Sequence, residues 1–157
     1  MNVPRNLLTV YSLTSESETH SLAQAFAASS RTDDCFALKG DLGSGKTTFA
    51  RAFIRALVGE DTAVSSPTFT LIQDYSAPAI DILHADLYRL ETREEIDAIG
   101  LIDQMAGKIS LIEWPEKIMS ILPEQALVLE WQIGERENAR QLHIYGVSEW
   151  KNRLPKI

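Results

Sequence analysis

The segment "GDLGSGKT", residues 40–47, has the residue types and spacing of a phosphate-binding loop, G-x-x-x-x-G-K-[ST]. Its glycines allow backbone angles that a Cβ would forbid, so that successive amide groups can point inward and surround phosphate oxygens. Lys46 would place a positive charge at the β- and γ-phosphates, and Thr47 would offer a hydroxyl to Mg²⁺. The segment therefore predicts a site for a nucleoside triphosphate with Mg²⁺.

The neighbouring sequence supplies the two elements that such a loop needs. Residues 35–40, "CFALKG", predict a short strand that runs into the loop. After the loop, apolar residues recur at helical spacing before Gly59, which would end the helix: Phe49, Ala52, Phe53, Ala56 and Leu57. The positive end of that helix dipole would face the phosphates. This context favours a phosphate loop over a glycine-rich turn that matches by chance.

A phosphate loop also needs an acidic residue for the Mg²⁺ shell, and this residue usually ends a neighbouring parallel strand. Residues 108–114 form a nearly continuous apolar run, typical of a strand buried in a parallel sheet. Pro115 disfavours helix at Trp114 and suits the first turn of a helix after it. Glu113 is therefore the candidate Mg²⁺ residue. The alternative is an ordinary carboxylate near a helix N-terminus.

The chain's three tryptophans all follow a glutamate, and two of these pairs favour a structural interpretation. In residues 126–133, alternation puts Trp131 on the apolar face and Glu130 on the other, so the acid should be solvated and the indole buried. Trp150 shares helical spacing with Val147 and Leu154, which predicts an amphipathic helix in the tail, residues 147–157.

Two further segments contain candidates for the same site. "SSPTFTL", residues 65–71, offers the hydroxyl of Thr68, which could sense a γ-phosphate as switch loops do. An ordinary Ser/Pro/Thr loop is an equal alternative. "HADLYRL", residues 84–90, contains Asp86, which could position water or the Mg²⁺ shell. Taken alone, such a run is more often a helix start or a surface ion pair.

The remaining elements follow from periodicity and capping signals. Further strands are predicted over residues 7–13, 69–75, 79–84, 126–133 and 140–147. The last two suit an antiparallel edge or a hairpin with "GEREN" as its turn. Two helices would begin at capping-box pairs and end near Ser29 and Gly100: Ser15 with Glu18, and Thr92 with Glu95. Strands mixed with helices imply an α/β sheet.

Composition sets the outer limits of these hypotheses. A chain of 157 residues with 45% apolar and 24% charged residues predicts a single globular domain over residues 1–157. Its apolar runs are too short to span a membrane, and its first residues do not resemble a signal peptide. Cys35 is the single cysteine, which fits a reducing cytoplasm. The net charge of −7 argues against a large basic face for nucleic acid.

Four motifs in order closely resemble the TsaE family, the bacterial ATPases of threonylcarbamoyladenosine tRNA modification. They lie at Gly40–Thr48, Ser66–Leu71, His84–Leu90 and Ile112–Pro115, and the resemblance covers about residues 7–147. It implies a P-loop NTPase-like α/β fold, with a mostly parallel central sheet, antiparallel edge strands and flanking helices. It also implies weak ATP hydrolysis and two protein partners, TsaB and TsaD. TsaD transfers the threonylcarbamoyl group, so tRNA would be met through the complex.

The resemblance also implies roles for single residues. Thr47 and Glu113 match the Mg²⁺ ligands, while Asp86 and Trp114 match further functional positions. The adenine side is expected near Ser15 and Glu16. The expected phosphate-side residues are Asp41, Leu42, Gly43, Ser44, Gly45, Lys46, Thr47 and Thr48. The "GERENAR" segment matches more loosely, so a nucleotide role for Arg136 or for Arg140 rests on a weaker likeness.

Two other function classes share the phosphate loop. A small-molecule kinase would need an acceptor pocket and usually a lid with arginines, but residues 115–135, the expected lid region, contain no Arg. A non-hydrolytic nucleotide-binding adaptor would bind ATP and release no phosphate. We expect the ATPase, with Lys46, Asp86 and Glu113 as its catalytic residues and with Thr68 and Trp114 facing a partner.

Overall fold

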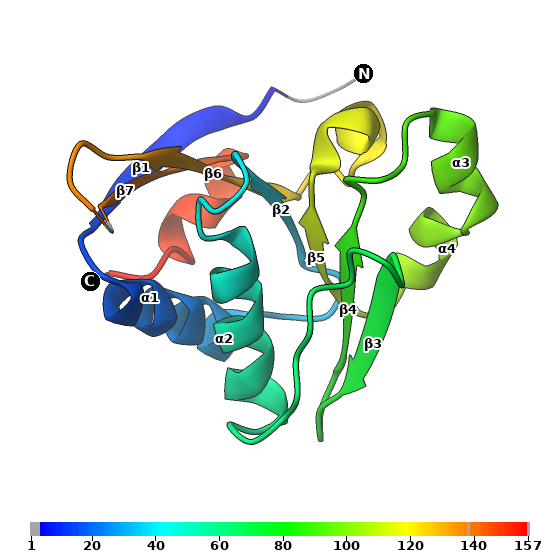
Figure 1. Ribbon diagram of the computed structural model, residues 1–157, viewed down its shortest axis with the longest axis horizontal. Coiled ribbons are helices and arrows are strands. Elements are labelled where there is room, and N and C mark those ends of the chain that lie inside the picture. Colours follow the sequence, from blue (N-terminus) through cyan, green and yellow to red (C-terminus); the bar gives the residue numbers. More distant parts are fainter. Residues whose placement is uncertain (1–3, 138, 157) are drawn as a thin grey trace.

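A computed structural model describes residues 4–137 and 139–156 of the chain, and within them seven strands form one mixed sheet (Figure 1). The strands are β1 (Asn6–Leu13), β2 (Cys35–Lys39), β3 (Ile72–Ser76), β4 (Asp81–Asp86), β5 (Ile109–Glu113), β6 (Leu127–Ile133) and β7 (Arg140–Gly146). Their order across the sheet is β1-β7-β6-β2-β5-β4-β3. The four central strands, β6-β2-β5-β4, run parallel, and the outer pairings are antiparallel. This arrangement confirms the predicted α/β sheet.

Helices cover both faces of the sheet. They are α1 (Glu16–Ser29), α2 (Lys46–Val58), α3 (Arg93–Ala98), α4 (Leu101–Met105) and the 3₁₀ helices η1 (Pro115–Ile121) and η2 (Ser148–Asn152). On one face α1 and α2 pack in a core with edge-to-face aromatic rings, among them Phe26 with Phe49 and with Phe36 (Figure 1). On the other face α3, α4 and η1 bury Ile96, Leu101 and Ile118 against Ala37 and Ile112 of the sheet. Both faces of β5 are therefore buried, as its continuous apolar run predicts.

The predicted helix starts are confirmed in detail. The Ser15 Oγ accepts a hydrogen bond from the Glu18 amide at 3.1 Å, and the Thr92 Oγ1 accepts one from the Glu95 amide at 3.2 Å. The Glu18 carboxylate departs from the usual capping box, because it accepts from the backbone amide and the hydroxyl of Thr14, each at 2.8 Å. These contacts fix the entry of α1, whose first residues lie near the site described below.

The structure corrects the predicted strand over 69–75. That strand starts only at Ile72, because residues 67–71 form a turn that ends with Leu71 in the left-handed region, at φ 69°. The Leu71 carbonyl accepts from the amide of Asp86 at 2.9 Å, so the turn lies against the end of β4. In turn, β4 continues two residues beyond the predicted end and places Asp86 at its C-terminus.

The structure also changes the expectations for β6, β7 and the tail. The hairpin of β6 and β7 is confirmed, but neither strand is an edge, since β6 also pairs with β2 and β7 with β1. Alternation places Ile133 on the same face of β6 as Trp131, yet Ile133 is 58% exposed at the end of the strand. The tail forms the short 3₁₀ helix η2 in place of a longer amphipathic helix, although Trp150 is buried as expected.

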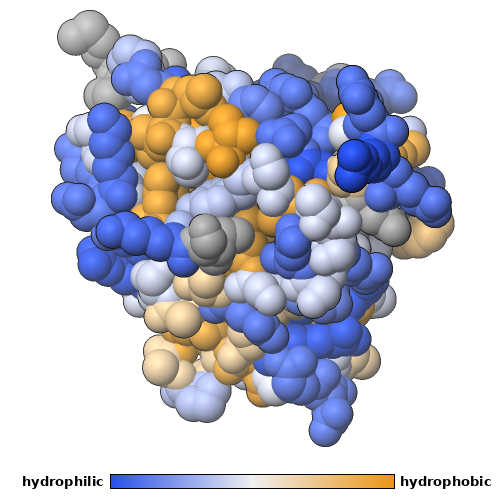
Figure 2. Space-filling model, turned by 90° about the vertical axis from the view of Figure 1, so that its left-hand side faces the viewer, coloured by the Kyte–Doolittle hydropathy of each residue, from blue (hydrophilic) through white to orange (hydrophobic). Residues whose placement is uncertain are grey.

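One side of the molecule has a largely hydrophilic surface (Figure 2). Figure 2 shows one side of the molecule covered largely by hydrophilic residues, with hydrophobic residues gathered in a patch near its top. Among residues 4–137 and 139–156, we find no helix with the length and hydrophobicity that a membrane span requires.

Candidate nucleotide-binding site

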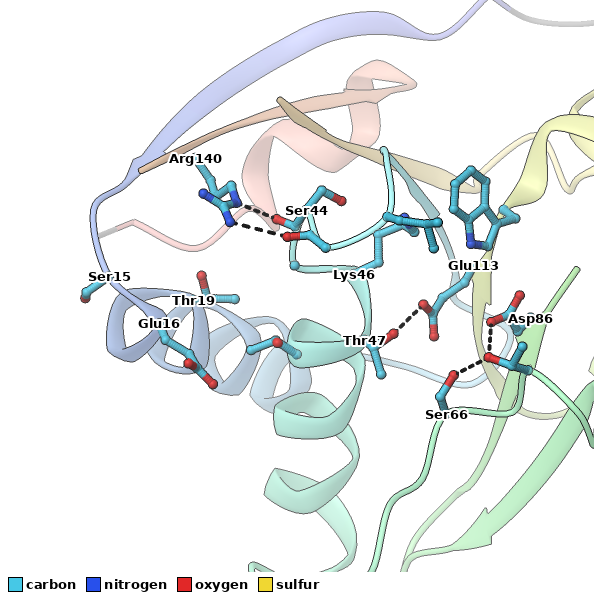
Figure 3. Close-up of a pocket in the computed structure, with 16 residues that line it drawn as sticks. Ser15, Glu16, Thr19, Ser44, Lys46, Thr47, Ser66, Asp86, Glu113 and Arg140 are labelled. Carbon is cyan, nitrogen blue, oxygen red and sulfur yellow. Dashed lines mark hydrogen bonds between the residues drawn. The ribbon is translucent and has the colours of Figure 1, made fainter. Parts of the chain in front are cut away.

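A cleft of about 360 Å³ opens at the C-terminal ends of β2, β4 and β5, where α2 begins (Figure 3). Its lining comes from the start of α1, the glycine-rich loop, the 66–68 turn and the ends of β4 and β5. The lining residues are Ser15, Glu16, Thr19, Leu42, Gly43, Ser44, Gly45, Lys46, Thr47, Thr48, Ser66, Thr68, Asp86, Glu113, Trp114 and Arg140. Ligands of open α/β sheets bind at this edge of the strands.

Trp131 forms the floor beneath the glycine-rich loop and explains two of its glycines. Gly40 has φ +152°, and a Cβ there would lie 2.7 Å from the Ser44 Oγ and 3.1 Å from the Trp131 carbonyl oxygen. Gly45 has φ +123°, and its Cβ would lie 3.3 Å from the Trp131 indole nitrogen. A side chain at either position would have a strained backbone and would be crowded against Trp131.

Lys46 is buried at the first position of α2, with 4% of its surface exposed. Its Nζ donates hydrogen bonds to the carbonyl oxygens of Gly40 and Asp41, the latter at 2.9 Å, and lies 4.0 Å from the ring centroid of Trp114. Burial lowers the pKa of Lys46, and the negative charge of Glu113 acts in the opposite direction. Phosphate oxygens would replace these carbonyl acceptors and would give the ammonium group a full counter-charge.

Thr47 and Glu113 meet across the cleft from two different elements. The Thr47 Oγ1 donates to the Glu113 Oε1 at 2.7 Å, and Glu113 is 2% exposed at the end of β5 (Figure 3). Mg²⁺ binds oxygen ligands at 2.0–2.1 Å in octahedral geometry, so that adjacent ligands are about 2.9 Å apart. A hydroxyl and a carboxylate oxygen at this spacing fit two adjacent positions of a Mg²⁺ shell.

Asp86 is buried, so it is neither a helix start nor a surface ion pair, the alternatives that the sequence left open. Its Oδ1 accepts from the Tyr88 amide at 2.9 Å and its Oδ2 from the Thr68 hydroxyl at 3.2 Å. A further hydroxyl, that of Ser66, lies 2.7 Å from the Thr68 Oγ1 (Figure 3). Burial raises the pKa of Asp86, against the Tyr88 hydrogen bond that lowers it, and the charge of Glu113 adds to the rise.

Trp114 adopts the left-handed backbone conformation, with φ 58° and ψ 58°, directly before Pro115. This is the break between strand and helix that the proline predicts, and non-glycine residues seldom adopt this conformation. Its half-buried ring lies between the Lys46 ammonium group and the ring of Tyr88, whose centroid is 4.9 Å away. Trp114 therefore contacts the lysine of the glycine-rich loop directly.

The structure brings together most of the residues predicted for the site but not all of them. Asp41 contributes its carbonyl to Lys46, yet it lines a separate groove of about 430 Å³ with Glu130 and Trp131. Arg136 is exposed in the hairpin turn and is absent from the described lining of the cleft. Arg140 lies there instead, and its guanidinium donates to the carbonyl oxygens of Ser44 at 2.9 Å and Gly43 at 3.3 Å (Figure 3).

Two further lining residues were missed by sequence reasoning. Thr19 lies one helical turn after Ser15 on α1, so the i, i+4 spacing could have indicated it. Ser66 comes two residues before Thr68 in the same turn.

Comparison with known proteins agrees with this geometry. A family model described as "Threonylcarbamoyl adenosine biosynthesis protein TsaE" matches residues 13–142. This chain belongs to the TsaE family. It is 48% identical to the tRNA threonylcarbamoyladenosine biosynthesis protein TsaE of Rickettsia bellii over 111 residues, which are 71% of this chain and 77% of that protein. It is 36% identical to the TsaE protein of Aquifex aeolicus over 134 residues, 85% of this chain and 92% of that protein.

A solved structure shares the fold. The crystal structure of YdiB from Bacillus subtilis superposes with a TM-score of 0.76 at 26% sequence identity, covering 96% of this chain and 92% of that chain. The predicted P-loop architecture with a mixed sheet and flanking helices is therefore confirmed for this TsaE-family chain.

Proposed function

We propose that this TsaE-family protein is a Mg²⁺-dependent ATPase that serves tRNA threonylcarbamoyladenosine formation in the cytoplasm together with TsaB and TsaD. The observation that carries the proposal is the 2.7 Å contact of Thr47 with Glu113 beside the buried Lys46. A hydroxyl, a carboxylate and an ammonium group that converge on a glycine-rich loop match the needs of a Mg²⁺-bound triphosphate.

Each residue has a defined task in this proposal. Lys46 and the amides at the start of α2 would neutralise the phosphate oxygens. Thr47 and Glu113 would hold Mg²⁺, directly or through water, and the bound ion would neutralise charge on the β- and γ-phosphates. Asp86, with its raised pKa and its fixed Oδ1, would orient the attacking water. Thr68, bonded to Asp86, would report the γ-phosphate to the surface of the 66–68 turn.

The proposal includes a low rate for the isolated protein. Phosphoryl transfer depends mainly on positioning and on electrostatic stabilisation of the transferring group. Within the described cleft the cationic side chains are Lys46 and Arg140, and the Arg140 guanidinium already donates to loop carbonyls. A partner protein that orders the site would raise the rate, which is the role proposed for TsaB and TsaD.

The test is phosphate release from ATP, with and without purified TsaB and TsaD. We expect release that requires Mg²⁺ and increases with both partners, and a loss of about 100-fold or more in Lys46→Ala. Lys39→Ala is the matched control, because Lys39 directly precedes the loop and its side chain is 41% exposed. Full tRNA modification by Lys46→Ala contradicts the proposal. ATP consumption that rises with a small metabolite and without partners identifies a kinase, and binding without release identifies an adaptor.

A further inference from the structure

His84 is a buried histidine that the proposed reaction leaves without a task. It lies in β4, two residues before Asp86, and its exposed fraction is 0%. Its Nε2 lies 2.6 Å from the Oε2 of Glu113 in the neighbouring strand β5. A fully buried histidine in contact with the carboxylate of Glu113 needs an explanation, because burying polar groups costs free energy.

The sheet places these side chains on one face. Alternate residues of a strand point to the same side, so His84 shares the α2-facing side of β4 with Asp86. Glu113 lies two residues after Leu111 in β5, so both side chains point to the same side of the sheet. Leu111 belongs to the core beneath α1 and α2, which places Glu113 on the α2-facing side. Beside the histidine on this face, Ile82 and Leu111 are both fully buried. The imidazole is therefore held in place by packing as well as by its contact with Glu113.

The two oxygens of Glu113 have different partners. Oε1 accepts from the Thr47 hydroxyl at 2.7 Å, and Oε2 meets the His84 Nε2 at 2.6 Å. An ionised carboxylate is an acceptor only, so the Nε2 of His84 must carry the hydrogen. Among residues 4–137 and 139–156, the buried Nδ1 of His84 has no hydrogen-bond partner.

We propose that His84 is a positioning residue for Glu113. Its Nε2–H binds Oε2 and fixes the rotation of the carboxylate, so that Oε1 stays beside Thr47 where a metal ion would bind. The inference rests on the proposed function, because it takes Glu113 as a ligand of Mg²⁺. Hydrogen bonds to metal-binding groups commonly account for about 10–100-fold in metal affinity.

A purely structural role for His84 makes a different prediction. A histidine that only filled the core would affect thermal stability when replaced and would leave metal affinity unchanged. Metal affinity measured apart from turnover therefore separates the two roles. The substitutions must also separate the hydrogen bond from the volume of the ring.

Three substitutions make this separation. His84→Gln keeps an amide N–H at the distance of Nε2. His84→Asn keeps an amide that is too short to reach Glu113, and His84→Leu removes the donor. His143→Leu is the matched control, because His143 lies in β7, stacks on Tyr145 and also has a buried Nδ1 without a described partner.

The experiment measures Mn²⁺ binding by electron paramagnetic resonance in the presence of ADP, and ADP binding without metal in parallel. We expect His84→Asn and His84→Leu to lose about 10–100-fold in Mn²⁺ affinity. In both variants ADP should bind without metal as it does in the wild type. His84→Gln and His143→Leu should retain Mn²⁺ affinity. If His84→Leu does not fold, the comparison of His84→Gln with His84→Asn decides the result.

The outcomes distinguish this inference from the proposed function. Wild-type Mn²⁺ affinity in His84→Asn or His84→Leu overturns the positioning role, provided that Glu113→Gln binds Mn²⁺ weakly in the same assay. Equal Mn²⁺ affinities of the wild type and Glu113→Gln overturn the metal site itself, and the proposed function with it. An equal loss in His84→Gln and His84→Asn shows that the ring, and not its N–H, is what the site requires.

Discussion

The same dipeptide, Glu-Trp, lies at the end of β5 and within β6, the two strands that flank β2, yet its two copies have opposite environments. At the end of β5, Glu113 is buried against Thr47 while Trp114 is half-buried at the mouth of the cleft. Within β6, Trp131 is buried beneath the glycine-rich loop, while Glu130 lies partly in solvent, 3.8 Å from Lys39. The acid is the buried member of the first pair, and the indole is the buried member of the second.

A difference of one residue in register causes this inversion. Leu38 of β2 is level with Glu113 on one side and with Leu129 on the other, and Lys39 is level with Glu130. Glu130 is thus one step further along the sheet than Glu113, and successive residues of a strand point to opposite faces. Glu113 consequently faces α2, whereas Glu130 faces away from it and Trp131 takes the inner position.

The largest difference in stability should be between the two indoles. Trp131 packs against Phe49, with ring centroids 5.4 Å apart, and has 3% of its surface exposed. Trp131→Ala should lower the free energy of unfolding by about 3–5 kcal/mol. Trp114→Ala should lower it by about 1 kcal/mol, mainly through the lost contact of its ring with Lys46. Urea titration of both variants checks this, and similar losses would contradict the assignment of Trp131 alone to the core.

The two acids should differ most in activity. Glu113→Gln keeps the shape and removes the charge, so Mg²⁺-dependent ATP turnover should fall by about 100-fold or more. Glu130→Gln is its matched control and should keep wild-type turnover. The measurement is phosphate release over a range of Mg²⁺ concentrations with TsaB and TsaD present. Unchanged turnover and nucleotide affinity in Glu113→Gln would reduce Glu113 to an ordinary buried carboxylate.

Asp86 extends the comparison to pH. Burial raises the pKa of Asp86, so the folded state favours the protonated carboxyl group. The stability that Asp86 contributes is therefore complete below the ordinary pKa of 3.8. It is lost as the pH rises through the pKa of the folded state. Asp86→Asn should therefore raise the thermal midpoint at pH 7, and the gain should shrink as the pH approaches 3.8. ATP turnover should fall by about 100-fold. Calorimetry across this pH range checks the sign, and a gain that grows toward acid pH would refute it.

The smallest effect concerns the ion pair of Lys39 with Glu130. Their side chains are 41% and 29% exposed at a distance of 3.8 Å, so water screens the attraction. Glu130→Gln should change the free energy of unfolding by less than about 1 kcal/mol, and the change should vanish in high salt. A larger or salt-independent loss would mean that Glu130 is as closely integrated as Glu113.

Much of the site could be predicted because its signals are local. The phosphate loop is a contiguous motif, and Pro115 marks the strand end that exposes Glu113 to the cleft. Arg140 has only the loose "GERENAR" match, which does not distinguish it from Arg136. It reaches the loop from β7 only because β6 and β7 fold back beside β2, and a lone arginine at the start of a strand carries no information about that.

The sequence by itself determined the phosphate loop, the helix caps, the strand that ends at Glu113 and membership of a family, since each depends on neighbouring residues or on motif order. Tertiary structure alone decided the order of the strands and their relative register. Register fixed which member of each Glu-Trp pair faces α2, and it brought His84 to Glu113. The physical reason is that a shift of one residue between strands reverses the face of every side chain, and hydrogen bonds between distant segments set that shift.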